Sequence, residues 1–442
     1  MPYNRAIDSD TTQAPVALAR ARHCGRWAAY VLIPSARVYR EIFSSEASIW
    51  FLPASEDEAV VALKLPSTTI QAVVSGCSLE LLFGRINGRA DVPLCTGLRC
   101  RDTIDRPLIS LNFQNHVEQY VALDAFLREG GGTAYLFNEL DMCVAWGRFA
   151  IEPIAAGEAR EFVGDPAALV PGEHSSRFTS EMDTYEEFVG HAYDPGEPRA
   201  DVHQLVVPLS ANQWEFSVNH FVGERERGQL ALGTQDDGLS LEAVAWFSLD
   251  SVFPEGLLKN PIVEEGNGAE RELTDVLAFY QYGHFLIEAK ALSESGEGFR
   301  RSHERKILTA QKHTRKAISQ LVGASKAIRS GRTIKSESGA EVNFDRDKPP
   351  HCIVLLAELQ HEGDWNDIVQ LMAEGMDVTG GFFHVLDLRE LILLLKGSNG
   401  KAELFDYNLM ERAKHFANTR SIHIQSRIPP NAAQQAVEPD TE

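Results

Sequence analysis

Short apolar runs separated by Gly, Pro, Asn and Asp dominate residues 27–153. Runs of this length between turn residues predict β-strands, which we expect at WAAYVLI, SIWFL, AVVALKL, TIQAVVSG, LELLFGRI, LISLNF and TAYLF. In HVEQYVALDAFLREGGG, the apolar residues between Val117 and Phe126 recur instead near helical spacing, and a glycine run follows. The pattern therefore predicts one helix packed on a sheet.

A polar stretch rich in Pro and Gly, from Glu158 to Glu187, has the composition of a linker and suggests a boundary near 160–185. After it, HQLVVPL, WEFSVNHF and LEAVAWFSL again predict strands. We expect a disordered lead over residues 1–24 and a β-rich N-terminal domain over 25–180. Residues 181–256 are expected to be a β-rich continuation of that domain or a second subdomain.

From residue 257 the pattern changes to alternating strands and helices. TDVLAFY, FLIEAKAL, CIVLLAEL and FFHVL predict strands, while DLRELILLLKG and a long segment from His303 to Ser330 predict helices. The long helix carries an apolar stripe of Ile307, Leu308, Ile318, Leu321, Val322 and Ile328. Residues 257–425 therefore predict a mixed sheet flanked by helices, and 426–442 a disordered tail. The expected fold class is α/β, of mixed α+β type, with a β-rich N-terminal module.

Charge is distributed unevenly along the chain. Forty-two Lys and Arg against 63 Asp and Glu give a net charge of -21, which would repel a polyanion unless basic residues gather locally. Residues 300–335 hold 11 basic residues and only one acid, so they carry about +10 and the rest of the chain about -31. We expect this segment to contact nucleic-acid phosphates, through Arg305, Lys312, Arg315 and Lys316. A solvated helix face is the alternative.

Other features narrow the class of protein. The six cysteines are scattered, which argues against a disulfide framework. The N-terminus lacks an apolar run of signal-peptide length, and no run reaches membrane-spanning length, so we expect a cytoplasmic protein without membrane contact. GxxxxGK[ST], GxGxxG, HExxH and GxSxG are absent, which leaves nucleotide hydrolysis, Rossmann cofactors, zincin proteolysis and α/β-hydrolase chemistry without support.

The segment with the most chemistry is a predicted hairpin around YQYG. Glu288 and Lys290 stand two residues apart in its second strand, so their side chains share a face, and pairing across the turn can bring Asp275 towards them. Two carboxylates can hold Mg²⁺ or Mn²⁺, with the backbone carbonyl of Ala289 as a further oxygen ligand. Lys290 would position or activate the attacking water and stabilise charge on phosphate. An exposed edge strand with Glu and Lys in water is the alternative.

This arrangement resembles the PD-(D/E)XK nuclease superfamily. Asp275 matches its strand-starting aspartate, residues 288–290 match its (D/E)-X-K triplet, and Thr274 stands at the position of the name-giving proline. The resemblance covers roughly 257–416 and implies a restriction-endonuclease-like fold. It also implies two supports. A helix glutamine, Gln311 or Gln320, would support the metal or lysine, and an extra acid from a preceding helix would be Glu272, with Glu270 and Glu265 as weaker candidates.

The leading prediction is therefore a Mg²⁺-dependent endonuclease that cleaves DNA, with RNA left open. The resemblance suggests a role in bacterial genome defence. A homodimer, or a protein partner bound through the N-terminal module, is an expected assembly. Two alternatives stay open: a nucleic-acid-binding or sensor protein that does not cleave, and an interaction protein in which the Glu-Ala-Lys triplet is a coincidence.

Overall fold

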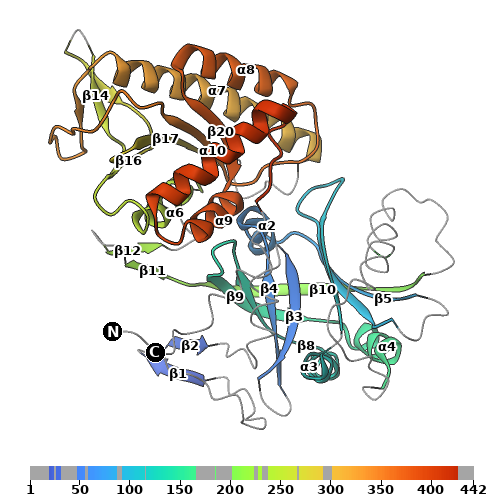
Figure 1. Ribbon diagram of the computed structural model, residues 1–442. Helices are drawn as coiled ribbons and strands as arrows, with labels where there is room; N and C mark the ends of the chain where they lie inside the picture. Colours follow the sequence, from blue (N-terminus) through green and yellow to red (C-terminus); the bar gives the residue numbers. More distant parts are fainter. Residues whose placement is uncertain are drawn as a thin grey trace, which may run out of the picture. The chain divides into compact units, whose positions relative to one another are not determined.

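The computed structural model divides the chain into two compact units, residues 1–102 with 106–215 and residues 103–105 with 216–442. Beside the strands β1 (Ala19–His23) and β2 (Arg26–Tyr30), it describes residues 47–54, 58–86, 92–114, 116–165, 185, 202–222, 227–230, 237–265, 268–291 and 301–426. Both units combine helices with sheets (Figure 1), so the expected mixed α/β class is confirmed.

Unit 1 is built on an eight-stranded sheet in the order β3-β4-β8-β9-β10-β5-β6-β7. Its strands are β3 (Ser48–Pro53), β4 (Ala59–Lys64), β5 (Leu79–Ile86), β6 (Cys95–Cys100), β7 (Leu108–Phe113), β8 (Gly131–Phe137), β9 (Cys143–Ala150) and β10 (Val202–Phe216). The side-chain amide of Asn112 in β7 donates to the carbonyl of Ile49 in β3 at 3.4 Å, so the two ends of this order approach each other. The expected β-rich module is therefore present.

Three helices accompany this sheet: α2 (Ser67–Val74), α3 (Val117–Arg128) and α4 (Pro153–Val163). The helix expected around residues 117–128 is confirmed as α3, and Gly130 follows its end with a left-handed φ of 65°. The strand expected at TIQAVVSG is wrong, because this segment forms α2. Pro66 directly precedes this helix, and the side chains of Ile70 and Val73 are buried on one of its faces.

Unit 2 contains a five-stranded mixed sheet in the order β13-β16-β17-β19-β20. Its strands are β13 (Leu257–Lys259), β16 (Val276–Tyr280), β17 (Gly283–Lys290), β19 (His351–Leu356) and β20 (Phe382–Asp387). β13, β16 and β17 pair antiparallel, whereas β17, β19 and β20 pair parallel. A small sheet of β14 (Ile262–Glu264), β15 (Glu270–Glu272) and β18 (Ile334–Lys335) lies in the same unit.

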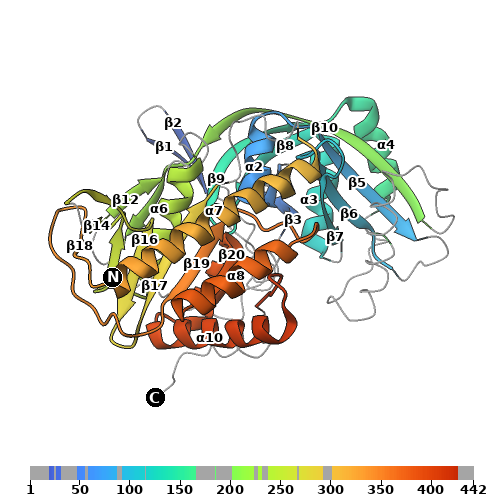
Figure 2. The same ribbon diagram turned by 90° about the horizontal axis from the view of Figure 1, so that it is seen from above.

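Helices cover both faces of the five-stranded sheet. α7 (His303–Arg329) and α8 (Asn366–Thr379) pack side by side on one face, and α6 (Asp237–Asp250), α9 (Leu388–Ser398) and α10 (Ala402–Thr419) lie on the other (Figures 1 and 2). Side chains of β17 alternate between these layers. Leu286 joins the core under α7, whereas Phe285 packs on Phe253 and Phe405.

One expected strand of unit 2 is also wrong. LEAVAWFSL lies within α6, and its residues Leu241, Val244, Ala245 and Leu249 are buried. A short continuous apolar run fits a buried helix as well as a buried strand, so periodicity alone could not separate the two. Within the described residues we find no helix whose length and hydrophobicity would let it span a bilayer.

The observed division between the units differs from the expected boundaries. It falls between Glu215 and Phe216, so the segment 181–256, predicted as a continuation of the first domain or a second subdomain, is shared between the units. Its strand β10 extends the sheet of unit 1, and its helix α6 packs in unit 2. The disorder expected for 1–24 and 426–442 lies outside the described residues, apart from β1 and Ser426.

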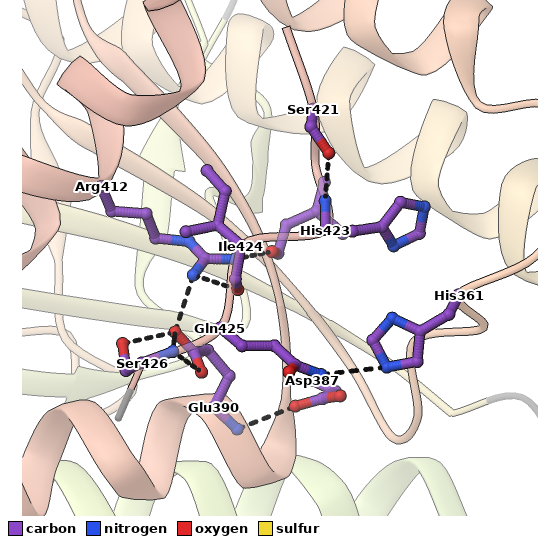
Figure 3. Close-up of polar contacts among 10 residues, drawn as sticks. His361, Asp387, Glu390, Arg412, Ser421, His423, Ile424, Gln425 and Ser426 are labelled. Atoms are coloured by element: carbon purple, nitrogen blue, oxygen red, sulfur yellow. Dashed lines mark hydrogen bonds and ion pairs between the residues drawn. The ribbon is translucent and has the colours of Figure 1, made fainter. Parts of the chain in front are cut away.

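A buried ion pair fastens α10 to the rest of unit 2 (Figure 3). Arg412 donates to Glu390 at 2.7 Å, and also to the carbonyls of Ile424 at 2.6 Å and Val385 at 3.0 Å. Glu390 accepts in addition from the backbone N–H and the hydroxyl of Ser426. The pair is thus surrounded by hydrogen bonds and joins α9, α10, β20 and the segment after α10.

Candidate active site

The β16–β17 hairpin places the predicted site residues opposite each other. Its register pairs Val276 with Ile287, so Asp275 stands across from Glu288. Asp275 Oδ2 accepts a hydrogen bond of 2.6 Å from the backbone N–H of Ala289. At the start of β16, the side-chain carboxylate of Asp275 therefore serves as the hydrogen-bond acceptor for a backbone N–H of β17.

Thr274, at the position of the family's proline, has a structural role in this chain. Its hydroxyl donates to the carbonyl of Ile287 at 2.7 Å, and the residue is buried. This bond fixes the start of the first strand against the second, immediately beside Asp275. The departure from proline therefore leaves the aspartate well anchored.

Lys290 joins the two carboxylates into one cluster. Its Nζ lies 2.7 Å from Glu288 Oε2 and 3.4 Å from Asp275 Oδ2. Glu288 is only 2% exposed and Asp275 8%. The structure thus brings the three predicted residues together in a buried place, and the alternative of an exposed edge strand is wrong.

Burial and the charges within this cluster shift the pKa values of Glu288 and Lys290. Burial, followed by the negative charge of Asp275, raises the pKa of Glu288 to about 7, although Lys290 acts in the opposite direction. Burial also disfavours the charge of Lys290, but Glu288 and Asp275 outweigh it and hold the pKa of the lysine above its ordinary value. The lysine therefore stays protonated near neutral pH, while Glu288 titrates there.

Two further carboxyl groups lie close to this cluster, and sequence reasoning missed one of them. Burial and then the charge of Asp275 raise the pKa of Glu242, on α6. The same causes raise the pKa of Glu272, which also shares a side-chain hydrogen bond with Asp275. Glu272 stands in strand β15 and not on a preceding helix as expected. Glu242 was not predicted as a site residue, because its segment was expected to be a strand and forms helix α6 instead.

The donor set is suited to a hard cation that keeps part of its water shell. No group of three or more His, Cys, Asp or Glu side chains among the described residues encloses an ion-sized space. Mg²⁺ is commonly held by one or two carboxylates with water completing the shell, and Lys290 engages one oxygen of each carboxylate. The carbonyl of Ala289 projects to the same side as its N–H, beside Asp275. Burial, and after it the charge of Asp275, raises the pKa values of Glu242, Glu272 and Glu288, and a bound cation would favour their charged forms.

The two helix glutamines lie away from the carboxylates. Gln311 is buried, and its amide donates to the carbonyl of Asp364 at 2.7 Å, after the end of β19. Gln320 is exposed on α7. No hydrogen bond joins either one to Asp275, Glu288 or Lys290 within the part of the chain that the structure describes. Gln311 instead fixes the loop beside its helix.

The predicted phosphate contacts form an exposed row on α7. Arg305, Lys312, Arg315 and Lys316 all face solvent, and Arg315 pairs with Asp367 of α8 at 2.5 Å. Because α7 connects the parallel strands β17 and β19, its first half lies near the carboxyl ends of these strands, where Lys290 also stands. Exposure keeps the row accessible to a polyanion.

Comparison of the chain with protein-family models, curated proteins and solved structures finds no match. The resemblance to the PD-(D/E)XK superfamily therefore depends on residues 274–290.

Proposed function

We propose that unit 2 is a metal-dependent endonuclease domain of restriction-endonuclease-like architecture that hydrolyses phosphodiester bonds in DNA. The observation that carries this proposal is the buried cluster of Asp275, Glu288 and Lys290 at one end of a central strand. Buried charges are costly to keep unless they are paired or used. In this cluster two carboxylates share one lysine, and a side-chain hydrogen bond joins Glu272 to Asp275, so carboxylates outnumber cations, as expected of a site that binds a cation.

Each residue of the cluster has a distinct task. Asp275, Glu288 and the carbonyl of Ala289 would hold Mg²⁺ or Mn²⁺, which supplies Lewis-acid polarisation of a phosphoryl oxygen when bound. Lys290 stays protonated, so it acts as a cation that orients a water and offsets charge on the phosphate, and not as a base. Its bonds to both carboxylates hold the ammonium group in place.

The exposed row on α7 would bind the backbone of the nucleic acid. Arg305, Lys312 and Lys316 face solvent, and their contacts with phosphates would add affinity without reading sequence. This arrangement suits a duplex held along the helix, while Lys290 reaches one phosphodiester.

The proposal is tested by incubating wild type and Lys290→Ala with plasmid, linear duplex and RNA, in Mg²⁺, Mn²⁺ or EDTA. We expect metal-dependent cleavage of DNA that falls by about 10²–10³-fold in the variant, because one charge-stabilising group is removed. Lys414→Ala, an exposed lysine of α10, is the matched control and should cut like wild type. Equal cutting by wild type and Lys290→Ala would sink the assignment of the lysine.

Metal binding is tested separately from cleavage by thermal unfolding with and without Mg²⁺. At about ten times its Kd, the ion should stabilise wild type by about 1.4 kcal/mol. Asp275→Asn should abolish this gain. Binding of DNA with no cleavage and no metal shift would instead support the alternative of a nucleic-acid-binding protein that does not cut.

A further inference from the structure

Unit 2 has a second candidate site at the opposite end of β17. A cavity of about 360 Å³ lies there, between the start of β17, the end of α7 and the segment before β19. It is lined by His284, by residues at the end of α7 and just after it, and by the Arg346–Pro350 stretch. His284 and Lys290 are six residues apart in one strand, which places the two sites about 20 Å from each other.

The lining of this cavity is positively charged. Arg329, Arg346 and Lys348 contribute three cations, and Asp347 contributes one carboxylate. Lys348 Nζ lies 3.9 Å from the carboxylate of Asp345, which is a weak contact between half-exposed groups. About two positive charges are therefore left to attract an anion.

The C-terminal end of α7 does not repel an anion at this cavity, because its last backbone carbonyls already accept hydrogen bonds. The backbone N–H of Gly331 donates to the carbonyl of Ile328 at 3.0 Å, and that of Arg332 donates to Ala327 at 3.4 Å. Arg346 donates to the carbonyl of Arg332 at 2.6 Å, so it is anchored while its charge stays at the cavity.

His284 provides an independent sign of a ligand. It lines the cavity, is only 1% exposed, and its Nδ1 has no hydrogen-bond partner among the described residues. Burial, with the nearby His351, lowers the pKa of His284 to about 4, so the ring is neutral at physiological pH. A buried ring nitrogen without a partner is costly, and a hydroxyl or phosphate oxygen in the cavity would satisfy it.

We propose that this cavity binds a phosphate monoester no larger than a mononucleotide. A phosphate monoester carries close to two negative charges near neutral pH, which matches the net charge of the lining. Arg329, Arg346 and Lys348 would hold the phosphate, and His284 would bond to the ligand deeper in the cavity. A volume of this size is at the lower end of small-molecule sites. The inference does not depend on the nuclease proposal.

The test measures binding of inorganic phosphate, adenosine 5′-monophosphate and adenosine to the full chain by calorimetry. We expect the first two to bind saturably and adenosine not to bind. Arg329→Gln and Lys348→Gln, both at exposed positions, should each weaken binding by roughly tenfold. Lys326→Gln, an exposed lysine of the same helix that does not line the cavity, should leave affinity unchanged.

His284 is tested with His284→Phe, which removes Nδ1, and His284→Asn, which restores a polar atom. We expect the first to weaken binding of the monophosphate and the second to recover part of it, with the unfolding midpoint recorded for both. Lys290→Ala should bind like wild type, which separates this site from the nuclease proposal.

The phosphate monoester could be a free metabolite or the end of a nucleic-acid strand. A 5′-phosphorylated oligonucleotide that displaces the monophosphate, while its 5′-hydroxyl counterpart does not, identifies a strand end. Displacement by neither identifies a free ligand. Equal displacement by both would show a backbone contact and overturn the proposal, as would absence of saturable binding of phosphate and monophosphate to wild type at about 10 mM.

Discussion

Unit 2 has two buried ionic clusters that differ in their ratio of cations to carboxylates. In the Glu390–Arg412 pair, one cation meets one carboxylate. Glu390 also accepts hydrogen bonds from Ser426, and Arg412 donates to two backbone carbonyls. In the cluster of Asp275, Glu288 and Lys290, one lysine serves two carboxylates, with Glu242 and Glu272 nearby. The first cluster pairs one cation with one carboxylate, whereas the second has more carboxylates than cations.

The difference separates a structural ion pair from a site. In a buried pair, a cation matched by one carboxylate leaves no net charge for an ionic ligand to balance. In the second cluster, burial and then the charge of Asp275 disfavour the charged form of Glu288 and raise its pKa, and a bound cation would favour that form. Substitutions should therefore act in opposite ways at the two places.

The largest expected effect is at the Glu390–Arg412 pair. Arg412→Met should lower the free energy of unfolding by about 3–5 kcal/mol, because Glu390 is left buried without its partner. Urea denaturation measures this loss. Lys414→Met, which breaks an exposed pair on the same helix, should cost at most about 0.5 kcal/mol. If Arg412→Met lowers the free energy of unfolding by less than about 1 kcal/mol, the Glu390–Arg412 pair is not the structural ion pair that we contrast with the candidate site.

A smaller effect is expected at Glu288, where substitution should stabilise the protein at high pH instead of destabilising it. Its folded-state pKa of about 7 lies above the ordinary 4.5, so its contribution to stability is complete below pH 4.5 and is lost as the pH rises through 7. In EDTA, the change between about pH 5 and pH 8 should be on the order of 2–3 kcal/mol.

The readout is the difference between wild type and Glu288→Gln across this range. The difference is needed because His284 and His384, whose pKa values are lowered, change stability in the opposite direction as they titrate. Glu288→Gln should become the more stable protein relative to wild type as the pH rises. A constant difference would show that Glu288 does not titrate abnormally.

The smallest effect is expected at the edge of the second cluster. Glu242→Gln should weaken Mg²⁺ binding by about fivefold, on the order of 1 kcal/mol, because one nearby negative charge is removed. Calorimetric titration with Mg²⁺ measures it, and Glu374→Gln, an exposed acid of α8, is the control. If both variants bind alike, Glu242 does not belong to the site.

Much of the geometry of the site could be predicted from the sequence. The alternation of FLIEAK puts Glu288 and Lys290 on one face, and a tight turn at YQYG sets the register that brings Asp275 to them. The long helix was predicted almost to its ends, and α7 is confirmed over His303–Arg329. Within its predicted stripe only Leu308 is clearly wrong, since this residue is 56% exposed.

What the sequence could not predict depends on burial in three dimensions. The run LEAVAWFSL in α6 is apolar at seven of its nine positions, so the polar face that marks a helix is nearly missing. α2 has only eight residues, about two turns, which is too short for helical periodicity to stand out. The place of Glu242 near Asp275 could not be predicted either, because it depends on how α6 packs on β16 and β17.

The position of the candidate site on β17 has a consequence for how it could be regulated. β17 is the middle strand of the five, with β16 and β19 bonded along its two edges. Amides in such a strand exchange with solvent only when the whole domain opens, and the flanks of Glu288 and Lys290 should be among the slowest. A strand that opens so rarely offers no backbone gate, so any control over this site must act through side-chain rotamers and access of the substrate.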